Sequence, residues 1–398
     1  MANIVIIGGG AAGCFCAAEL SKLHPDWKIT VLEANTRPMA KLSITGGGRC
    51  NLTNTFRNVQ SLEKIYPRGF RLMKRLLHKF SQTDCMNWFE DLGVRLIEQE
   101  DQCVFPRSQD AMEVVHALER AMHEGGVHVK CSCKVSSIDS DLTVTFTQNK
   151  SCSTIKPDAV ILTSGGATAD LLSRTDISIE QAVPSLFTLK LEDEEIKKLM
   201  GTVVQKAVLS LQGTRFRSEG TLLITDWGVS GPATLCLSSY AARYLCENGY
   251  RGTLSINWLS ANEDEAKVLL DQLGKSSTRT IGNSHPQKLT ERLWKHLLTR
   301  AGVRDDLRWK ELGSKGYSRL VNTLINDCYT IIGRARFKEE FVTCGGVSLS
   351  EINPETMECK KIPGLYLAGE VLDIDAVTGG FNLQAAWSTA WTAAHSII

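Results

Sequence analysis

The sequence contains no apolar run of about 18 residues, the length that a helix needs to cross a bilayer. The first residues also lack a basic leader and pass directly from a short apolar run into a glycine-rich turn. This pattern is typical of a β-strand rather than of a signal peptide. We therefore expect a cytoplasmic protein with no membrane partner.

The chain as a whole also lacks an excess of charge of either sign. Its 45 Lys and Arg residues face 44 Asp and Glu residues, which gives a net charge of +1. Nucleic-acid-binding surfaces usually need a clustered basic excess, so we expect no nucleic-acid partner. The length of 398 residues allows two or three domains with a sizeable core.

C-x-x-C pairs are absent, although the chain has 13 cysteines. Their absence argues against a zinc site and against a secreted disulfide framework, so we expect no metal and mostly reduced, buried thiols. Cys131 and Cys133 are separated by one residue, which leaves a redox pair open as an alternative. No Ser/His/Asp arrangement stands out, so the sequence identifies no catalytic acid or base.

The N-terminal segment carries the strongest signal in the chain. Residues 4–7 form a wholly apolar, β-branched run, as in a parallel strand that is covered on both faces. Gly8, Gly10 and Gly13 follow with the G-x-G-x-x-G spacing of a dinucleotide-binding turn. There the first glycine allows a tight bend, the second lets the backbone approach a pyrophosphate, and the third lets helix and strand pack closely. An ordinary glycine-rich turn is the alternative.

Glu33 strengthens the dinucleotide interpretation. It follows a second apolar strand, residues 28–32, and lies 20 residues after Gly13. A carboxylate at this place can accept hydrogen bonds from the ribose hydroxyls of an adenosine. An exposed glutamate at a strand end is the alternative. Because a carboxylate disfavours a 2′-phosphate, we expect FAD or NAD(H) rather than NADP(H).

A second glycine-rich segment begins near Lys41. Gly46, Gly47 and Gly48 stand directly before Arg49. The three glycines leave the backbone without side chains between the cations Lys41 and Arg49. This pattern predicts a second side of the cofactor site, where a flat ring or a phosphate lies against the backbone. A flexible surface loop is the alternative.

Hydrophobic periodicity divides the chain into modules. After residue 185 the pattern changes to a period of two, which predicts a β-rich region, and residues 262–297 carry apolar stripes at helical spacing. The apolar sheet pattern returns at residues 364–369. We predict a dinucleotide-binding domain over residues 1–185 and 335–398. A β-rich, barrel-like domain would cover 186–258 and 313–334, and a helical module 259–312.

The last predicted helix begins near Asn382, directly after Gly379 and Gly380, because apolar residues recur at helical spacing from Leu383 onward. The glycines before it permit the close approach of a flat ring, and the first N–H groups of a helix favour negative charge. A packing helix whose glycines only make a turn is the alternative.

Several long motifs resemble one known family. They are residues 8–13 (GGGAAG), 45–54 (TGGGRCNLTN), 228–233 (GVSGPA), 342–347 (VTCGGV), 364–373 (GLYLAGEVLD) and 378–387 (TGGFNLQAAW), together with Lys41. Over nearly its whole length the chain is similar to a bacterial FAD-binding flavoprotein family with members named aminoacetone oxidase or 3-dehydro-bile-acid reductase.

The resemblance implies an α/β, two-dinucleotide-binding (Rossmann-like) FAD domain with an inserted β-rich domain and a helical module. It also implies an FAD-dependent oxidoreductase that acts on a small organic substrate, with NAD(P)H as a candidate reductant. The flavin N1 and O2 edge would then face the start of the helix near Asn382.

Residues 127–135 are also expected to form a strand, and the resemblance implies that the backbone at its end, Val135, contacts the adenine. The cofactor contacts that the resemblance implies fall into four groups. They are Gly8, Gly10, Ala11, Ala12 and Gly13 at the pyrophosphate; Glu33, Ala34 and Val135 at the adenosine; Lys41, Gly47, Arg49, Cys50 and Asn51 on the flavin side; and Ser164, Gly165, Gly369, Glu370, Asn382 and Leu383 around the rest of FAD.

The chain departs from the family in two places. Gln102 and Cys103 stand where relatives carry a Gly-Arg pair, and the glycine-rich loop that usually follows Gly166 is missing. The second departure would widen the mouth of the site or alter its substrate. Two other functions stay open: a nicotinamide dehydrogenase that uses the first site alone, and a flavin-carrying binding or sensor protein without turnover.

Overall fold

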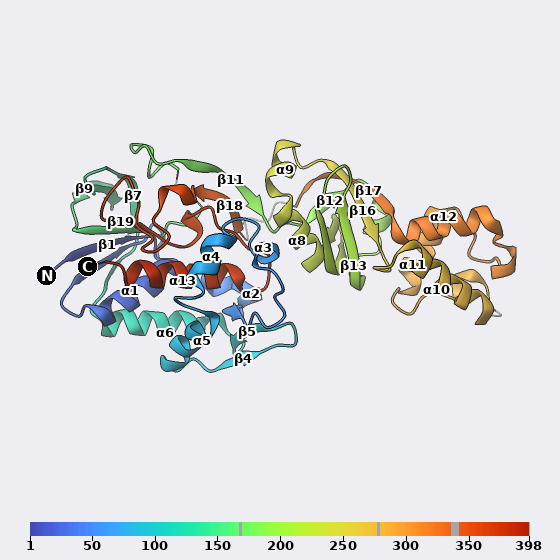
Figure 1. Cartoon of the computed structure of the whole chain (residues 1–398), viewed down its shortest axis with the longest axis horizontal. Helices are drawn as coiled ribbons and strands as arrows, with labels where there is room; N and C mark the ends of the chain where they lie inside the picture. Colours follow the sequence, from blue (N-terminus) through green and yellow to red (C-terminus); the bar gives the residue numbers. More distant parts are fainter. Residues whose placement is uncertain (167–168, 277–278, 336–341, 398) are drawn as a thin grey trace. The chain divides into compact units, whose positions relative to one another are not determined.

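A computed structural model describes residues 1–166, 169–276, 279–335 and 342–397. The chain separates into two compact units, Met1–Val183 with Val342–Ile398 and Pro184–Phe341 (Figure 1). The first unit is therefore made from both ends of the sequence, and the second is inserted into it.

A parallel sheet forms the centre of the first unit, in the order β19-β10-β1-β2-β6. Its strands are β1 (Asn3–Ile7), β2 (Lys28–Leu32), β6 (His128–Lys130), β10 (Ala159–Leu162) and β19 (Leu365–Leu367). The last residues of neighbouring strands are in register, because Ile7 lies opposite both Leu32 and Leu162, and Leu162 lies opposite Leu367. Residues that follow these strands therefore meet at one edge of the sheet.

The main helices of the first unit are α1 (Ala11–Leu23), α6 (Ala111–Glu124) and α13 (Phe381–Ala394). Helix α1 packs against both α13 and α6. Both α1 and α13 carry buried alanines, Ala17 and Ala18 on α1 and Ala386 and Ala390 on α13. The N- and C-terminal parts of the chain are thus joined in one core.

Smaller sheets surround the central one. They are the ribbon of β7 (Cys133–Ile138), β8 (Val144–Gln148) and β9 (Ser151–Ile155), the sheet of β3 (Thr53–Asn54), β4 (Leu96–Glu98) and β5 (Cys103–Pro106), and the pair β11 (Ile179–Ser185) and β18 (Val342–Val347).

Short helices connect these strands. They are α2 (Thr45–Gly48), α3 (Leu62–Ile65), α4 (Phe70–Leu76) and α5 (Gln82–Asp91), with 3₁₀ turns at Leu42–Ile44, Leu349–Glu351 and Gly369–Val371.

The second unit contains a closed barrel in the order β12-β15-β14-β13-β16-β17. Its strands are β12 (Leu189–Leu191), β13 (Val203–Leu211), β14 (Arg217–Thr225), β15 (Gly228–Ser230), β16 (Gly252–Asn257) and β17 (Asp327–Arg334). Its helices are α7 (Glu194–Lys197), α8 (Pro232–Tyr240), α9 (Ala242–Glu247), α10 (Glu263–Ser276), α11 (Glu291–Ala301) and α12 (Gly313–Ile325), with 3₁₀ turns at Ile281–Asn283 and Trp309–Glu311. The period-two pattern after residue 185 therefore corresponds to barrel strands.

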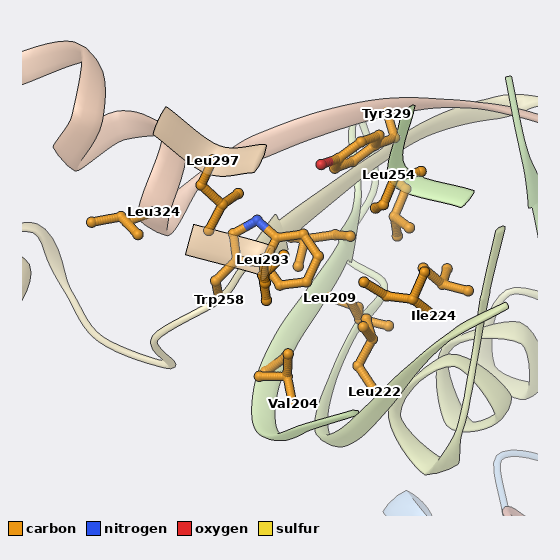
Figure 2. Packing of buried hydrophobic residues seen from close by; sticks show 14 of the residues in the cluster. Val204, Leu209, Leu222, Ile224, Leu254, Trp258, Leu293, Leu297, Leu324 and Tyr329 are labelled. Carbon is orange, nitrogen blue, oxygen red and sulfur yellow. The ribbon is translucent and has the colours of Figure 1, made fainter. Parts of the chain in front are cut away.

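One apolar core runs through the barrel and its helices (Figure 2). Leu209 and Leu254 come from barrel strands, and Leu293 and Leu324 come from α11 and α12. Trp258, which follows β16 directly, is fully buried in the same cluster. Residues 313–325, which the sequence pattern placed in the β-rich part, instead form α12 and pack against α10 and α11.

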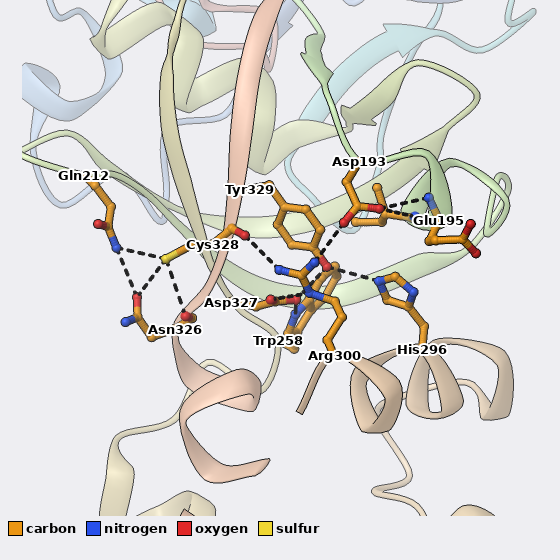
Figure 3. A network of polar contacts seen from close by, with 11 residues as sticks. Asp193, Glu195, Gln212, Trp258, His296, Arg300, Asn326, Asp327, Cys328 and Tyr329 are labelled. Atoms are coloured by element: carbon orange, nitrogen blue, oxygen red, sulfur yellow. Dashed lines mark hydrogen bonds and ion pairs between the residues drawn. The ribbon is translucent and has the colours of Figure 1, made fainter. Parts of the chain in front are cut away.

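A network of hydrogen bonds and ion pairs also connects α11 to the barrel (Figure 3). Arg300 on α11 donates to Asp327 on β17 (Nε to Oδ1, 2.7 Å) and to Asp193 (Nη1 to Oδ2, 2.8 Å). Trp258 Nε1 and the Tyr329 hydroxyl both donate to Asp327 Oδ2, at 3.0 and 2.6 Å. Every residue of this network belongs to the second unit, and we infer a structural role for it.

Three chemical features bear on the expectations from the sequence. Cys131 and Cys133 are free thiols, as are the other cysteines. Within the residues that the structure describes, no cluster of His, Cys, Asp and Glu could hold a metal ion. No helix in this same part of the chain is both long and apolar enough to cross a membrane.

Candidate functional site

The glycine turn after β1 is closed by a hydrogen bond from the Gly8 N–H to the Leu32 carbonyl, 2.9 Å long. Gly8 has a φ of +102°, and a Cβ there would lie 2.6 Å from the Thr163 carbonyl oxygen. A Cβ on Gly13 would collide with the Gly8 carbonyl oxygen and lie 2.6 Å from Thr163 Oγ1. Both positions therefore need glycine for the packing of the loop itself.

Gly10 differs from its two neighbours in the motif. Its φ of −82° and ψ of −165° suit any L residue, and a Cβ there would meet no atom within 4 Å. Helix α1 starts directly after it, with no acidic residue in its first turn and no side chain from the described residues capping that end. The open side of Gly10 and the first N–H groups of α1 together fit the pyrophosphate of a dinucleotide.

Glu33 is 7% exposed at the end of β2, and its carboxylate organises the loops around it. Oε2 accepts the Gly9 N–H at 2.8 Å, and Oε1 accepts both the backbone and the side-chain N–H of Asn35 at 2.7 Å. A carboxylate offers about four acceptor sites, so roughly one remains for a ligand. The sequence predicted that Glu33 accepts from both ribose hydroxyls, whereas its contacts leave room for about one such bond.

Several predicted residues from distant parts of the chain meet beside this turn. A Cβ on Gly369 would lie 2.8 Å from the Ala12 Cβ, and a Cβ on Gly165 would lie 3.5 Å from Glu370 Oε2. Lys41 Nζ lies 3.6 Å from the same Glu370 oxygen. Oε1 of Glu370 accepts the Thr343 N–H at 2.7 Å, so this carboxylate is held by the protein and faces a cation.

The second glycine segment adopts an unusual backbone. Gly46, Gly47 and Gly48 all have left-handed φ values of +59°, +71° and +82°, which glycine adopts at little cost. A Cβ on Gly47 or Gly48 would meet no atom within 4 Å, so this stretch of backbone has an open side. Arg49 lies over the Phe105 ring, 4.5 Å from its centroid, and donates Nε to the Gly46 carbonyl at 3.1 Å.

Cys50 is fully buried, and burial raises the pKa of its thiol to about 12. At neutral pH it is a protonated thiol, and a nucleophilic or redox role would need the thiolate. Because the whole residue is buried, a contact between Cys50 and the cofactor would need the loop around it to open.

Asn51 and Asn382 both use their amides inside the protein. With its nitrogen facing the Thr53 carbonyl (3.1 Å), the Asn51 amide accepts the Gly380 N–H at 3.2 Å. Asn382 accepts the Ala376 N–H and donates to the Ala376 carbonyl, both at 2.9 Å. Any cofactor contact at the start of α13, Leu383 included, would therefore rest on backbone N–H groups rather than on these amides.

The glycine before α13 is also explained by packing within the protein itself. A Cβ on Gly380 would collide with the Thr53 carbonyl group and would lie 2.7 Å from the side-chain amide of Asn51. The alternative that this glycine serves packing is thus supported by contacts with residues 51–53. That the flavin ring approaches Gly380 stays a prediction.

We expect Gly380→Ala to destabilise the FAD-free protein by about 1–2 kcal/mol, the cost of placing a side chain in a left-handed conformation such as its φ of +87°. The collision with Thr53 would add to this cost. Urea unfolding of the FAD-free variant measures the effect, with Gly47→Ala as the control, since it has a positive φ but an open side. Equal losses in both variants would show that the Thr53 contact does not matter.

Val135 occupies a different position from the one predicted. The sequence pattern suggested one strand ending at Val135, but the chain forms β6 and then turns into β7, where Val135 pairs with Phe146 of β8. The register shifts between Val135 and Ser137. A backbone contact with adenine would thus come from within a ribbon rather than from the end of a sheet strand.

Thr163 is a structural residue of the site that the sequence did not reveal. Its hydroxyl lies 3.0 Å from the Ile7 carbonyl and 2.7 Å from the Gly8 carbonyl, and it donates to these oxygens. Thr163 follows β10, far from the glycine motif in the sequence, so no local pattern signals the contact. Only the order of strands in the sheet makes β10 a neighbour of β1.

Comparison with known proteins identifies the chain. The family described as HI0933-like protein Rossmann domain matches residues 2–396. The chain belongs to this family. It is 30% identical over 411 residues to the ribosomal RNA dihydrouridine synthase of Escherichia coli K12, covering 100% of this chain and 98% of that protein. It is 27% identical over 414 residues to the 3-dehydro-bile acid delta(4,6)-reductase of Clostridium scindens, covering 100% and 99%.

Solved structures agree on the fold. The 3-ketosteroid-delta4-(5alpha)-dehydrogenase of Rhodococcus jostii RHA1 matches with a TM-score of 0.52 at 13% identity, covering 99% of this chain and 96% of that one. A flavocytochrome c3 fumarate reductase matches with a TM-score of 0.51 at 15% identity, covering 99% and 78%. The HI0933-like chain is an FAD-dependent oxidoreductase with a Rossmann-type FAD domain, as the sequence predicted.

The expectation of no nucleic-acid partner stays a prediction. It rested on the balanced charge of the whole chain, but a relative that matches this HI0933-like chain over its full length is named for ribosomal RNA. Overall charge therefore does not exclude a nucleic-acid partner.

Proposed function

We propose that this flavoenzyme reduces a carbon–carbon double bond conjugated to a carbonyl group, and that its substrate is a uridine in ribosomal RNA. The observation that carries this proposal is the full-length similarity to a ribosomal RNA dihydrouridine synthase. The bile acid reductase supports the reaction class, because both names describe the saturation of a double bond next to a carbonyl. In uridine the bond is C5=C6, which is conjugated to the C4 carbonyl.

FAD, once bound and reduced, would supply a hydride to one carbon of the polarised double bond and return to its oxidised form, and a proton from water would add to the neighbouring carbon. The open backbone at Gly10 and the start of α1 would hold the pyrophosphate, with Glu33 at the adenosine ribose. Lys41 and Glu370 would lie beside the ribityl group of FAD, which joins the pyrophosphate to the flavin ring. NAD(P)H is the proposed electron donor, and the cytoplasm the proposed location.

A small-molecule enone is the second candidate substrate. The identity of 27% to the bile acid reductase, nearly as high as that to the RNA enzyme, favours it. The glycine-rich loop that usually follows Gly166 in the family is missing here, and its loss would widen the mouth of the site or alter the substrate. Residues 167–168, at the start of this segment, lie outside the described residues.

Two measurements separate these substrates. We expect the holoenzyme, reduced anaerobically by NADH or NADPH, to convert uridine in ribosomal RNA from a strain that lacks this gene. Nucleoside mass spectrometry would detect the gain of two hydrogen atoms. Rapid flavin reoxidation by enones, with no change in the RNA, would overturn the uridine assignment and favour the second candidate. Failure with both would overturn the reaction class.

A further inference from the structure

Positive charge is concentrated in one segment of this nearly neutral chain. Residues 57–80 contain seven Lys or Arg residues and one acidic residue, whereas the whole chain has a net charge of +1. The helix α4 and the residues around it lie in this segment. The overall balance of charge therefore conceals a local basic excess.

Helix α4 presents this charge to solvent. Arg71, Lys74 and Arg75 are exposed and recur at a spacing of three and four residues, so they share one face of the helix. We call these three residues the basic stripe. Leu72 and Met73 are buried on the other side. The apolar side of α4 is thus used by the fold and is not free to enter a lipid bilayer.

Nearby carboxylates neutralise only part of the charge. Glu355 pairs with both Arg75 (Nη1 to Oε1, 2.6 Å) and Lys79 (Nζ to Oε2, 2.8 Å), so one carboxylate serves two cations. Arg71 lies 5.6 Å from the centroid of the Phe70 ring. The face of α4 therefore keeps a net positive charge.

The basic stripe is fixed next to the segment that leads into α13. Tyr66 donates its hydroxyl to the Phe381 carbonyl at 2.9 Å, and Arg68 forms an ion pair with the buried Asp375. Helix α4 packs against α13, whose first turn is expected to face the flavin (Figure 1). Groups bound along α4 would therefore lie beside the flavin end of the cofactor site.

We propose that the basic stripe binds the RNA phosphates that flank the reacting uridine. This inference rests on the proposed function and specifies how its RNA substrate is held. Phosphate contacts from Lys and Arg supply much of the affinity for RNA and fix its position, while reading little of its sequence. An acidic small molecule would need one cation, whereas a row of exposed cations suits a polyanion.

The test compares two double variants of the holoenzyme with the same change in net charge. Arg71→Glu/Lys74→Glu alters the basic stripe. Lys22→Glu/Lys134→Glu alters exposed cations at the end of α1 and on the β7 ribbon. The probe is deproteinised ribosomal RNA from a strain that lacks this gene, and its dissociation constant is measured across a salt series.

We expect the stripe variant to bind this RNA roughly tenfold or more weakly at 0.1 M salt, and to lose about 2 from the slope of log K against log salt. The control should retain the wild-type slope. Wild-type affinity and slope in the stripe variant, or an equal loss in the control, would overturn the proposal.

Two further readouts separate this inference from the proposed reaction. NADPH oxidation and FAD content should be unchanged in the stripe variant, because Arg71 and Lys74 are exposed on α4 and neither is a predicted cofactor residue. If the stripe controls RNA binding but no dihydrouridine forms in wild-type reactions, the reaction assignment fails and the binding surface stands. If dihydrouridine forms equally well in the stripe variant at limiting RNA, the binding surface fails.

Discussion

Gly10→Val is expected to lower the affinity for FAD by about 10- to 100-fold while leaving the FAD-free protein as stable as the wild type. The residue has an ordinary φ of −82°, and a Cβ there meets no protein atom within 4 Å. The Cβ therefore has free space in the FAD-free protein, and the collision that we expect for the valine side chain is with a bound pyrophosphate. Forcing extra methyl groups into a filled site costs about 1–3 kcal/mol, and 1.4 kcal/mol corresponds to tenfold in affinity.

Gly13→Val is the matched control for Gly10→Val. Its side chain would collide with the Gly8 carbonyl group and with Thr163, so this variant should lose stability without FAD as well. FAD titration followed by flavin fluorescence, together with thermal unfolding of both FAD-free variants, measures the difference. FAD affinity in Gly10→Val equal to the wild-type value would place the pyrophosphate elsewhere.

The parts of the site that the sequence revealed are those made by neighbouring residues. The apolar run before Gly8 and the helix after Gly13 follow from short-range patterns, and the structure forms β1 and α1 at these places. Residue spacing alone also indicated Glu33 at the end of β2. In each case the signal lies within about one strand–turn–helix unit.

The parts that the sequence missed depend on contacts between distant segments. Thr163 supports the glycine turn only because β10 lies beside β1. The glycine at position 380 is explained by the backbone at Thr53, more than three hundred residues away, and no local pattern contains that information. Val135 was placed at a strand end because the alternation of apolar and polar residues over 127–135 continues through the turn between β6 and β7.

The same limit applies to charge. The total for the chain gave no reason to expect a nucleic-acid partner, whereas α4 places Arg71, Lys74 and Arg75 on one exposed face. A helix of seven residues is long enough to align three cations. The charge of a short segment can therefore indicate a nucleic-acid partner even when the net charge of the whole chain is close to zero.

Glu33→Gln is expected to destabilise the FAD-free protein by about 1.5–3 kcal/mol and to weaken FAD binding about tenfold. The amide cannot accept from Gly9 on one side and Asn35 on the other, because one of its two heteroatoms is a donor. The loss of one hydrogen bond to a buried charged group has this magnitude. The affinity for FAD falls as well, because a neutral amide at position 33 accepts a hydrogen bond from a ribose hydroxyl less strongly than the carboxylate does.

Glu124→Gln is the control, since it removes the same charge from an exposed residue at the end of α6. Urea unfolding of the FAD-free proteins measures the loop-forming role of Glu33, and FAD titration of the folded fraction measures its role at the ribose. A stability loss with an unchanged FAD dissociation constant would mean that Glu33 only holds the glycine turn and the Asn35 loop together. Unchanged stability would mean that the hydrogen bonds from Gly9 and Asn35 contribute nothing to the fold, and that the carboxylate is present for the ligand alone.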